Sequence, residues 1–145
     1  MHPLTEWIRY SEENGVEFPM TVIAGGMIIS GNLSPFARYE RWCKEIDRRT
    51  RLAGGAVTLP NIKLPPLTAE ERAEFREQWE ARLAAARAER GYPTDDDVPP
   101  GLLDYFCLSN AKMRTVTYEF IVVQTASVGA FFPGRLTRQD GGRVG

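Results

Sequence analysis

The chain has 145 residues, of which 43% are hydrophobic and 26% charged, and its formal net charge is −1. This length is enough for one domain with a real core, so we interpret residues 1–145 as a single domain. A net charge so close to zero gives no support for electrostatic capture of nucleic acid or membrane by the chain as a whole. The charge is uneven, because residues 65–104 hold five Arg and ten acidic residues, whereas residues 105–145 hold five basic and two acidic residues.

The residue types that carry common chemistries do not occur in recognisable patterns. His2 is the only histidine, and Cys43 and Cys107 have no CxxC spacing, so the converging ligands of a zinc site are missing. Both cysteines lie in apolar segments and are predicted to be buried free thiols. There is no glycine-rich phosphate loop with its lysine, no nucleophile elbow and no His-Asp-Ser set. We therefore expect no catalytic residues, no cofactor, no metal and no enzymatic activity.

The N-terminus does not resemble a signal peptide. The first residues lack a positive region followed by a long apolar run, and no stretch approaches membrane-spanning length. The sequence therefore predicts a cytoplasmic protein with no membrane partner. The closing residues 137–145 are rich in glycine and are predicted to form a disordered tail.

The N-terminal third predicts a helix followed by a hairpin. Apolar side chains at helical spacing indicate a helix over residues 3–14, and Gly15 is a plausible stop. Residues 18–24 and 27–33 then read as two strands joined by a turn at 25–26, where two glycines lie together. Gly31 lies inside the return strand, where glycine is expected only if the strand bends sharply or another backbone approaches closely.

A helical insertion is predicted over residues 34–100. Ser34 and Pro35 provide an N-cap and a first helical position for a helix that runs to about Thr50. Residues 53–66 read as a loop, and Thr68 with Glu71 forms a capping box for a second helix that ends before Gly91. The apolar residues of this second helix form a narrow stripe, which could dock on the chain's own sheet or on a partner. We take its members as partner-binding candidates: Phe75, Trp79 and Leu83.

The last third predicts further strands over residues 105–111, 120–123 and 127–134. With the first hairpin they predict an α+β fold, a small and strongly bent antiparallel β-barrel with an N-terminal helix and a helical insertion between the second and third strands. Small barrels of this kind expose edge strands, which are usually paired with a neighbouring subunit. We therefore expect a homo-oligomer and take as edge candidates Phe120, Val122, Val128, Ala130 and Phe132.

Two segments resemble the motifs of Sm-like barrels. Residues 25–33 resemble the first Sm motif, in which a hairpin glycine is followed by a second glycine in the bent strand, and residues 122–128 lie where the second motif falls. This resemblance implies RNA binding as an alternative function. Sm-like RNA pockets use an Asp/Asn loop after the second strand and an Arg-Gly near the fourth. In this chain the helical insertion replaces the Asp/Asn loop, and Gln124-Thr125 occupies the position of the Arg-Gly. We therefore expect no specific nucleic-acid binding.

The order of several segments is similar to that of the gas vesicle accessory protein U family. The similar segments are residues 15–33, the helix near Tyr39, residues 106–112 and residues 129–134, with a departure at residues 118–122. The resemblance implies a non-enzymatic accessory protein of gas vesicle formation or clustering, located in the cytoplasm in association with gas vesicles. Its partners would be itself and the vesicle shell or other accessory proteins. The sequence leaves open the direct partner, the oligomer size and whether clustering is promoted or limited.

Overall fold

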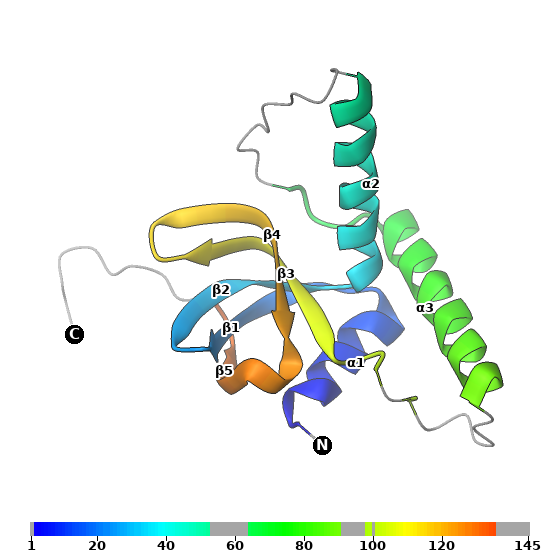
Figure 1. Cartoon of the computed structure of the whole chain (residues 1–145), viewed down its shortest axis with the longest axis horizontal. Helices are drawn as coiled ribbons and strands as arrows, with labels where there is room; N and C mark the ends of the chain where they lie inside the picture. Colours follow the sequence, from blue (N-terminus) through cyan, green and yellow to red (C-terminus); the bar gives the residue numbers. More distant parts are fainter. Residues whose placement is uncertain (1, 53–63, 91–97, 100, 136–145) are drawn as a thin grey trace.

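The computed structural model describes residues 2–52, 64–90, 98–99 and 101–135. These residues form an α+β structure with an N-terminal helix and an antiparallel five-stranded sheet, as the sequence predicts (Figure 1). None of the described helices is long and apolar enough to cross a membrane. The elements in chain order are α1 (Leu4–Asn14), β1 (Phe18–Ala24), β2 (Met27–Ser34), α2 (Phe36–Leu52), α3 (Ala69–Arg90), β3 (Tyr105–Met113), β4 (Val116–Gln124), the 3₁₀ turn η1 (Thr125–Ser127) and β5 (Val128–Pro133).

The first hairpin forms where its glycines predict it. Gly15 ends α1 in the left-handed conformation with φ 63°. Gly25 and Gly26 have φ values of 56° and 79°, which side chains rarely tolerate, and they join β1 to β2 in the predicted turn.

The sheet is open. Its strand order is β4-β3-β2-β1-β5, and every neighbouring pair is antiparallel. Strands β4 and β5 are therefore the two edges of the sheet and are not paired with each other. The β-barrel predicted from the sequence is not confirmed, because the strand pairing forms an open sheet.

Gly31 is required by a close approach between β2 and β3. A Cβ atom at this position would lie 3.0 Å from the Cα of Ala111 and 3.0 Å from the carbonyl oxygen of Ser109. The strand register shifts beside it, between Ser30 and Asn32, opposite Asn110 with its positive φ of 47°. Of the two explanations that the sequence leaves open for Gly31, a bent strand or a close backbone approach, the close approach is observed.

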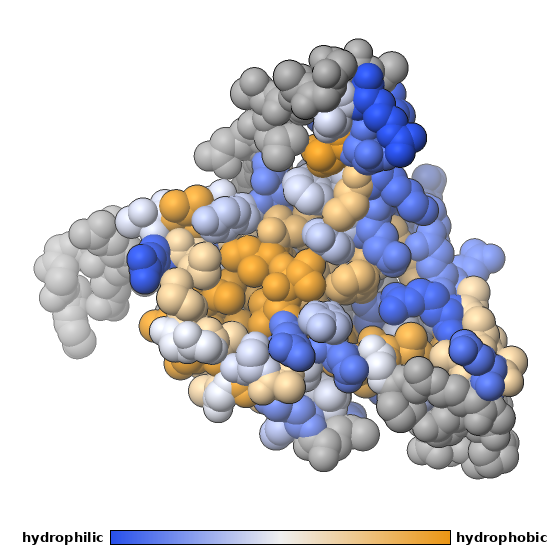
Figure 2. All heavy atoms as spheres, in the orientation of Figure 1, coloured by the Kyte–Doolittle hydropathy of each residue, from blue (hydrophilic) through white to orange (hydrophobic). Residues whose placement is uncertain are grey.

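The main core lies on one face of the sheet. Alternate residues of all five strands point to this face, and Leu4 and Ile8 of α1 cover it. Apolar side chains also gather in the middle of the view in Figure 2, whereas the surface on the side of α2 and α3 is mostly polar. The buried core residues are Leu4, Ile8, Met20, Val22, Ile29, Leu33, Phe106, Leu108, Ala111, Val123 and Val128.

Helices α2 and α3 lie between β2 and β3 in the chain, and α3 packs against α1 and α2 (Figure 1). The capping box of α3 is confirmed, because the Thr68 N–H donates to Glu71 Oε1 at 3.1 Å and the Glu71 N–H donates to Thr68 Oγ1 at 3.1 Å. The predicted cap of α2 is wrong. The Phe36 N–H of its first turn donates to the side chain of Glu12 at 2.6 Å, and the Ser34 hydroxyl bonds elsewhere.

Some sequence predictions lie outside the described residues. These are the tail over residues 137–145, the part of the predicted loop that spans residues 53–63, and the helix stop at Gly91.

Candidate functional site

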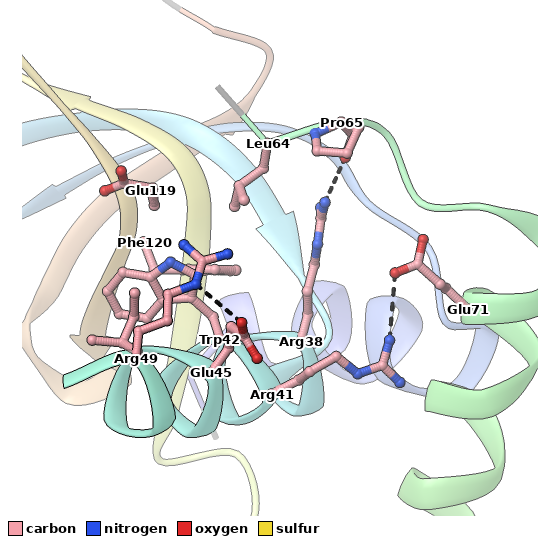
Figure 3. Close-up of a pocket in the computed structure, with 11 residues that line it drawn as sticks. Arg38, Arg41, Trp42, Glu45, Arg49, Leu64, Pro65, Glu71, Glu119 and Phe120 are labelled. Atoms are coloured by element: carbon pink, nitrogen blue, oxygen red, sulfur yellow. Dashed lines mark hydrogen bonds and ion pairs between the residues drawn. The ribbon is translucent and has the colours of Figure 1, made fainter. Parts of the chain in front are cut away.

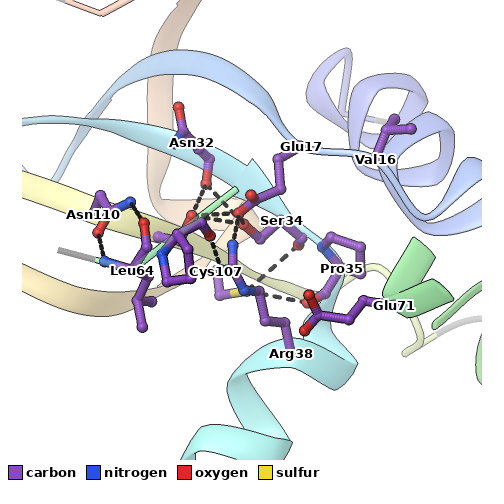
Figure 4. Close-up of polar contacts among 12 residues, drawn as sticks. Val16, Glu17, Asn32, Ser34, Pro35, Arg38, Leu64, Glu71, Cys107 and Asn110 are labelled. Carbon is purple, nitrogen blue, oxygen red and sulfur yellow. Dashed lines mark hydrogen bonds and ion pairs between the residues drawn. The ribbon is translucent and has the colours of Figure 1, made fainter. Parts of the chain in front are cut away.

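The densest convergence of polar side chains lies on the face of the sheet opposite the core. Its members, here called the polar cluster, are Glu17, Ser34, Arg38 and Ser109 (Figure 4). The Ser109 hydroxyl donates to Glu17 Oε2 at 2.6 Å, and the Ser34 hydroxyl contacts both Glu17 and Ser109. Arg38 Nη1 lies 2.5 Å from the same carboxylate oxygen. Four segments of the chain therefore meet at one carboxylate.

The Glu17–Arg38 ion pair is buried. The side chains are 11% and 8% exposed, respectively. Burial of two charges is costly unless their remaining hydrogen-bonding groups are satisfied. Arg38 Nη2 donates to the carbonyl oxygen of Pro65 at 2.5 Å, and the serines donate to Glu17, so the pair is supported on both sides. The pair connects the segment before β1 to α2 and to the chain at Pro65.

Asn110 fixes the chain on the other side of Pro65. Its side-chain oxygen accepts the Leu64 N–H at 2.8 Å, and its side-chain nitrogen donates to the Leu64 carbonyl at 3.0 Å (Figure 4). The Asn110 amide thus forms with the Leu64 backbone the two hydrogen bonds that a neighbouring strand would otherwise form. Arg38 and Asn110 thus anchor the chain that leads into α3.

The hydroxyl groups of the polar cluster are buried and hydrogen-bonded within it. Ser34 and Ser109 are buried, and both hydroxyls are engaged with Glu17. The Cys107 thiol contacts the Ser34 carbonyl at 3.4 Å, and burial raises the pKa of this thiol well above its usual range, so it stays protonated and weakly nucleophilic. In the part of the chain that the structure describes, no group of three or more His, Cys, Asp or Glu could hold a metal ion.

A pocket of about 400 Å³ lies between α2 and β4 (Figure 3). The wall includes Trp42 and Phe120, whose ring centroids are 5.5 Å apart. The cations at its rim are paired, since Arg41 contacts Glu71 and Glu74, and Arg49 contacts Glu45. The volume suits a small molecule, but the arginines of the described lining are already paired with carboxylates, and the remaining charged lining residue is an acid, Glu119. The lining residues are Arg38, Arg41, Trp42, Glu45, Ile46, Arg49, Leu64, Pro65, Glu71, Glu119 and Phe120.

A second concave surface lies where α1 meets the ends of β1 and β5. We call it the aromatic groove and define it by Trp7, Tyr10, Phe18, Pro19 and Pro133. The Phe18 ring lies 5.5 Å from that of Trp7 and 6.1 Å from that of Tyr10. Tyr10 is 55% exposed and Trp7 38% exposed, so large aromatic surfaces face solvent.

The predicted partner-binding stripe of α3 is buried inside this chain. Phe75 and Trp79 are each 1% exposed, and Leu83 is also buried. Phe75 packs with residues of α2 and of the segment before α3, and the Arg41 guanidinium lies 4.6 Å from its ring centroid. The stripe is therefore not an exposed docking surface. Of the two interpretations that the sequence left open, packing on the chain itself is the one observed, although the contacts are to other helices and not to a barrel.

The predicted edge residues divide into two groups. Val122, Ala130 and Phe132 are exposed on the two edge strands, with exposed fractions of 37% for Val122 and 39% for Phe132. Phe120 is half-buried against Tyr39 and Trp42 of α2. Val128 lies on the edge strand β5, but its side chain is buried in the core.

Sequence reasoning missed the polar cluster and the aromatic groove. The members of each come from separate elements, and only the tertiary fold brings them together. A charged residue directly before a strand, as at Glu17, was the one available signal. Comparison with family models, with curated proteins and with solved structures finds no match to this chain.

Proposed function

We propose that this protein is a non-enzymatic assembly protein that self-associates through its sheet edges, β4 of one copy pairing with β5 of the next. The single observation that carries the proposal is the open sheet with two unpaired edge strands. An unpaired edge exposes a row of backbone N–H and C=O groups, which a second strand can satisfy.

The side chains along these edges favour pairing. Val116, Tyr118 and Val122 on β4 are exposed apolar residues, and Phe132 on β5 is another. Neither strand contains a lysine, a residue that commonly protects edges from pairing, and β5 has no charged residue, whereas β4 has one, Glu119. Because the two edges differ, their pairing is head-to-tail, which forms a ring or an open filament.

The strand order is compatible with the Sm-like resemblance, in which a bent sheet of this connectivity approaches a barrel. We propose that the sheet belongs to this class, with its remaining opening between β4 and β5 used for assembly.

The setting we propose is gas vesicle formation or clustering, on the basis of the sequence resemblance. The segments that carry this resemblance lie in the ordered β1–β2 hairpin, α2, β3 and β5. The protein would act by self-association and by contact with the vesicle shell or with other accessory proteins.

Flotation tests this setting. Gas vesicles rise on centrifugation, so purified vesicles mixed with the protein should carry it into the floating layer. Val122→Lys, which places a charge on the β4 edge, should leave the protein in the liquid below if assembly is needed for shell contact. A wild-type protein that never floats with vesicles would overturn the gas vesicle setting, while self-association would remain to be judged by its own measurement.

A further inference from the structure

We infer that the aromatic groove receives the β3–β4 hairpin tip, Arg114–Thr115, of a second copy of this chain. This inference rests on the proposed pairing of β4 with β5 and names the side-chain contact that would accompany it. Strand lengths, the position of the turns and charge favour this occupant.

We take the pairing of β4 with β5 of the next copy as antiparallel, like every neighbouring pair within the sheet, and this direction sets which ends meet. The η1 turn follows β4 and precedes β5, so the η1 turns of two paired copies meet at one end of the new ladder. At the other end, the start of β4 in one copy lies beside Pro133 at the end of β5 in its neighbour. Pro133 is also a wall of the aromatic groove.

The strands differ in length, and this carries the hairpin tip beyond β5. Strand β4 has 9 residues and β5 has 6. The unmatched part of β4 is then three residues, which span about 10 Å at the usual rise of a strand. Because the η1 turns crowd the opposite end, this overhang and the tip extend past Pro133. Proline has no N–H to continue the ladder, so backbone pairing is weakened at this point and side chains of the tip supply the further contact.

The chemistry of the tip matches the groove. Lys112 and Arg114 are exposed cations of the hairpin. Tyr10 and Trp7 are exposed aromatic residues, and a guanidinium is attracted to the face of an aromatic ring. Glu6 and Glu13 lie four residues before and three residues after Tyr10 on α1. Glu13 is paired with Arg9, so Glu6 is the acidic group beside the tyrosine that a cation of the tip would meet.

The test compares dissociation constants by sedimentation velocity in full-length variants. Tyr10→Ala and Arg114→Gln should each weaken association about tenfold, as expected for loss of a desolvated aromatic or arginine contact. The double variant should be little weaker than either single variant, because both remove the same contact. Tyr105→Ala is the matched control, since Tyr105 is 51% exposed but pairs with Gln124 at the opposite end of β4.

The outcomes separate this inference from the proposed function. If wild type associates and Tyr10→Ala and Arg114→Gln associate as strongly as Tyr105→Ala, the aromatic groove does not bind the hairpin tip. The proposed pairing of the sheet edges would then remain valid without this contact. Additive losses in the double variant would also overturn the contact. If wild type stays monomeric at all concentrations, both the assembly function and this inference are wrong. Circular dichroism melts of each variant confirm that a loss of association is not a loss of folding.

Discussion

The carboxylate of Glu12, near the end of α1, accepts the backbone N–H of Phe36 at the start of α2, with 2.6 Å between oxygen and nitrogen. Glu12 is 4% exposed, and its other oxygen lies 4.0 Å from Arg82 of α3. One buried carboxyl group thus joins the three helices. Its position supplies the acceptor that the first turn of α2 would otherwise lack.

Stability should fall as pH rises through the titration of Glu12. Burial raises the pKa of this carboxyl from 4.5 to about 7, against the opposing effects of the Phe36 N–H and Arg82. Between these two values the folded state holds a proton that the unfolded state has released, so the free energy of unfolding decreases with pH by up to about 1.4 kcal/mol per unit. Glu12→Gln removes this contribution, so urea titrations at pH 5 and pH 7.5 should show the variant gaining stability relative to wild type at the higher pH. Parallel pH dependences of the two proteins would contradict this.

Arg38→Met should destabilise the fold by about 3 kcal/mol or more, because it leaves the Glu17 carboxylate buried without its partner. The double variant Glu17→Gln/Arg38→Met should lose less than Arg38→Met alone, since no isolated charge remains. Arg41→Met is the control on the same helix. Arg41 is 43% exposed in its ion pairs, so its loss should cost less than about 1 kcal/mol. Equal losses for Arg38→Met and Arg41→Met in chemical denaturation would show that the polar cluster contributes no special stability.

Gly31→Ala should cost about 1–3 kcal/mol, because the added methyl group would meet the backbones of Ala111 and Ser109 at 3.0 Å. Gly129→Ala is the control in β5, where the nearest atom to an added Cβ is 4.0 Å away. Thermal unfolding of both variants measures the difference. A Gly31→Ala protein as stable as Gly129→Ala would mean that β2 and β3 are not held at this separation.

Trp79→Ala should lower the melting temperature sharply, because removal of a buried tryptophan commonly costs 3–5 kcal/mol. Glu80→Ala, at the exposed neighbouring position, should change stability little. A Trp79→Ala variant that melts like wild type but loses partner capture would instead restore the sequence-based hypothesis that this stripe is a docking surface.

The local elements could be predicted from sequence because their signals are local. The glycine pair at 25–26, the Thr68–Glu71 capping box and the helical spacing of Phe75, Trp79 and Leu83 each act within one element. What covers an element depends on distant residues. Ser34 precedes a helix as a capping residue should, yet its hydroxyl is hydrogen-bonded to Glu17 and Ser109. The backbone N–H of the first turn of α2 is capped instead by the side chain of Glu12.

The surface against which the apolar stripe of α3 packs could not be predicted from sequence either. A narrow apolar stripe on a charged helix is the same in sequence whether it faces a partner or the chain's own helices. Alternation also cannot tell an edge strand's inward face from its outward face, so the edge candidates Val128 and Phe132 look alike in sequence, although Val128 is buried in the core and Phe132 is exposed.

The most direct measurement of the central claim is the mass of two edge variants, alone and mixed, by sedimentation velocity at micromolar concentrations. Val122→Lys blocks β4 and leaves β5 free, whereas Phe132→Lys blocks β5 and leaves β4 free. Head-to-tail assembly predicts that wild type forms oligomers, that each variant alone is a monomer, and that an equal mixture forms a dimer and nothing larger, because only one compatible pair of edges remains. A wild-type protein with the mass of one chain throughout, or a Phe132→Lys protein that still dimerises through β4 alone, would contradict the account.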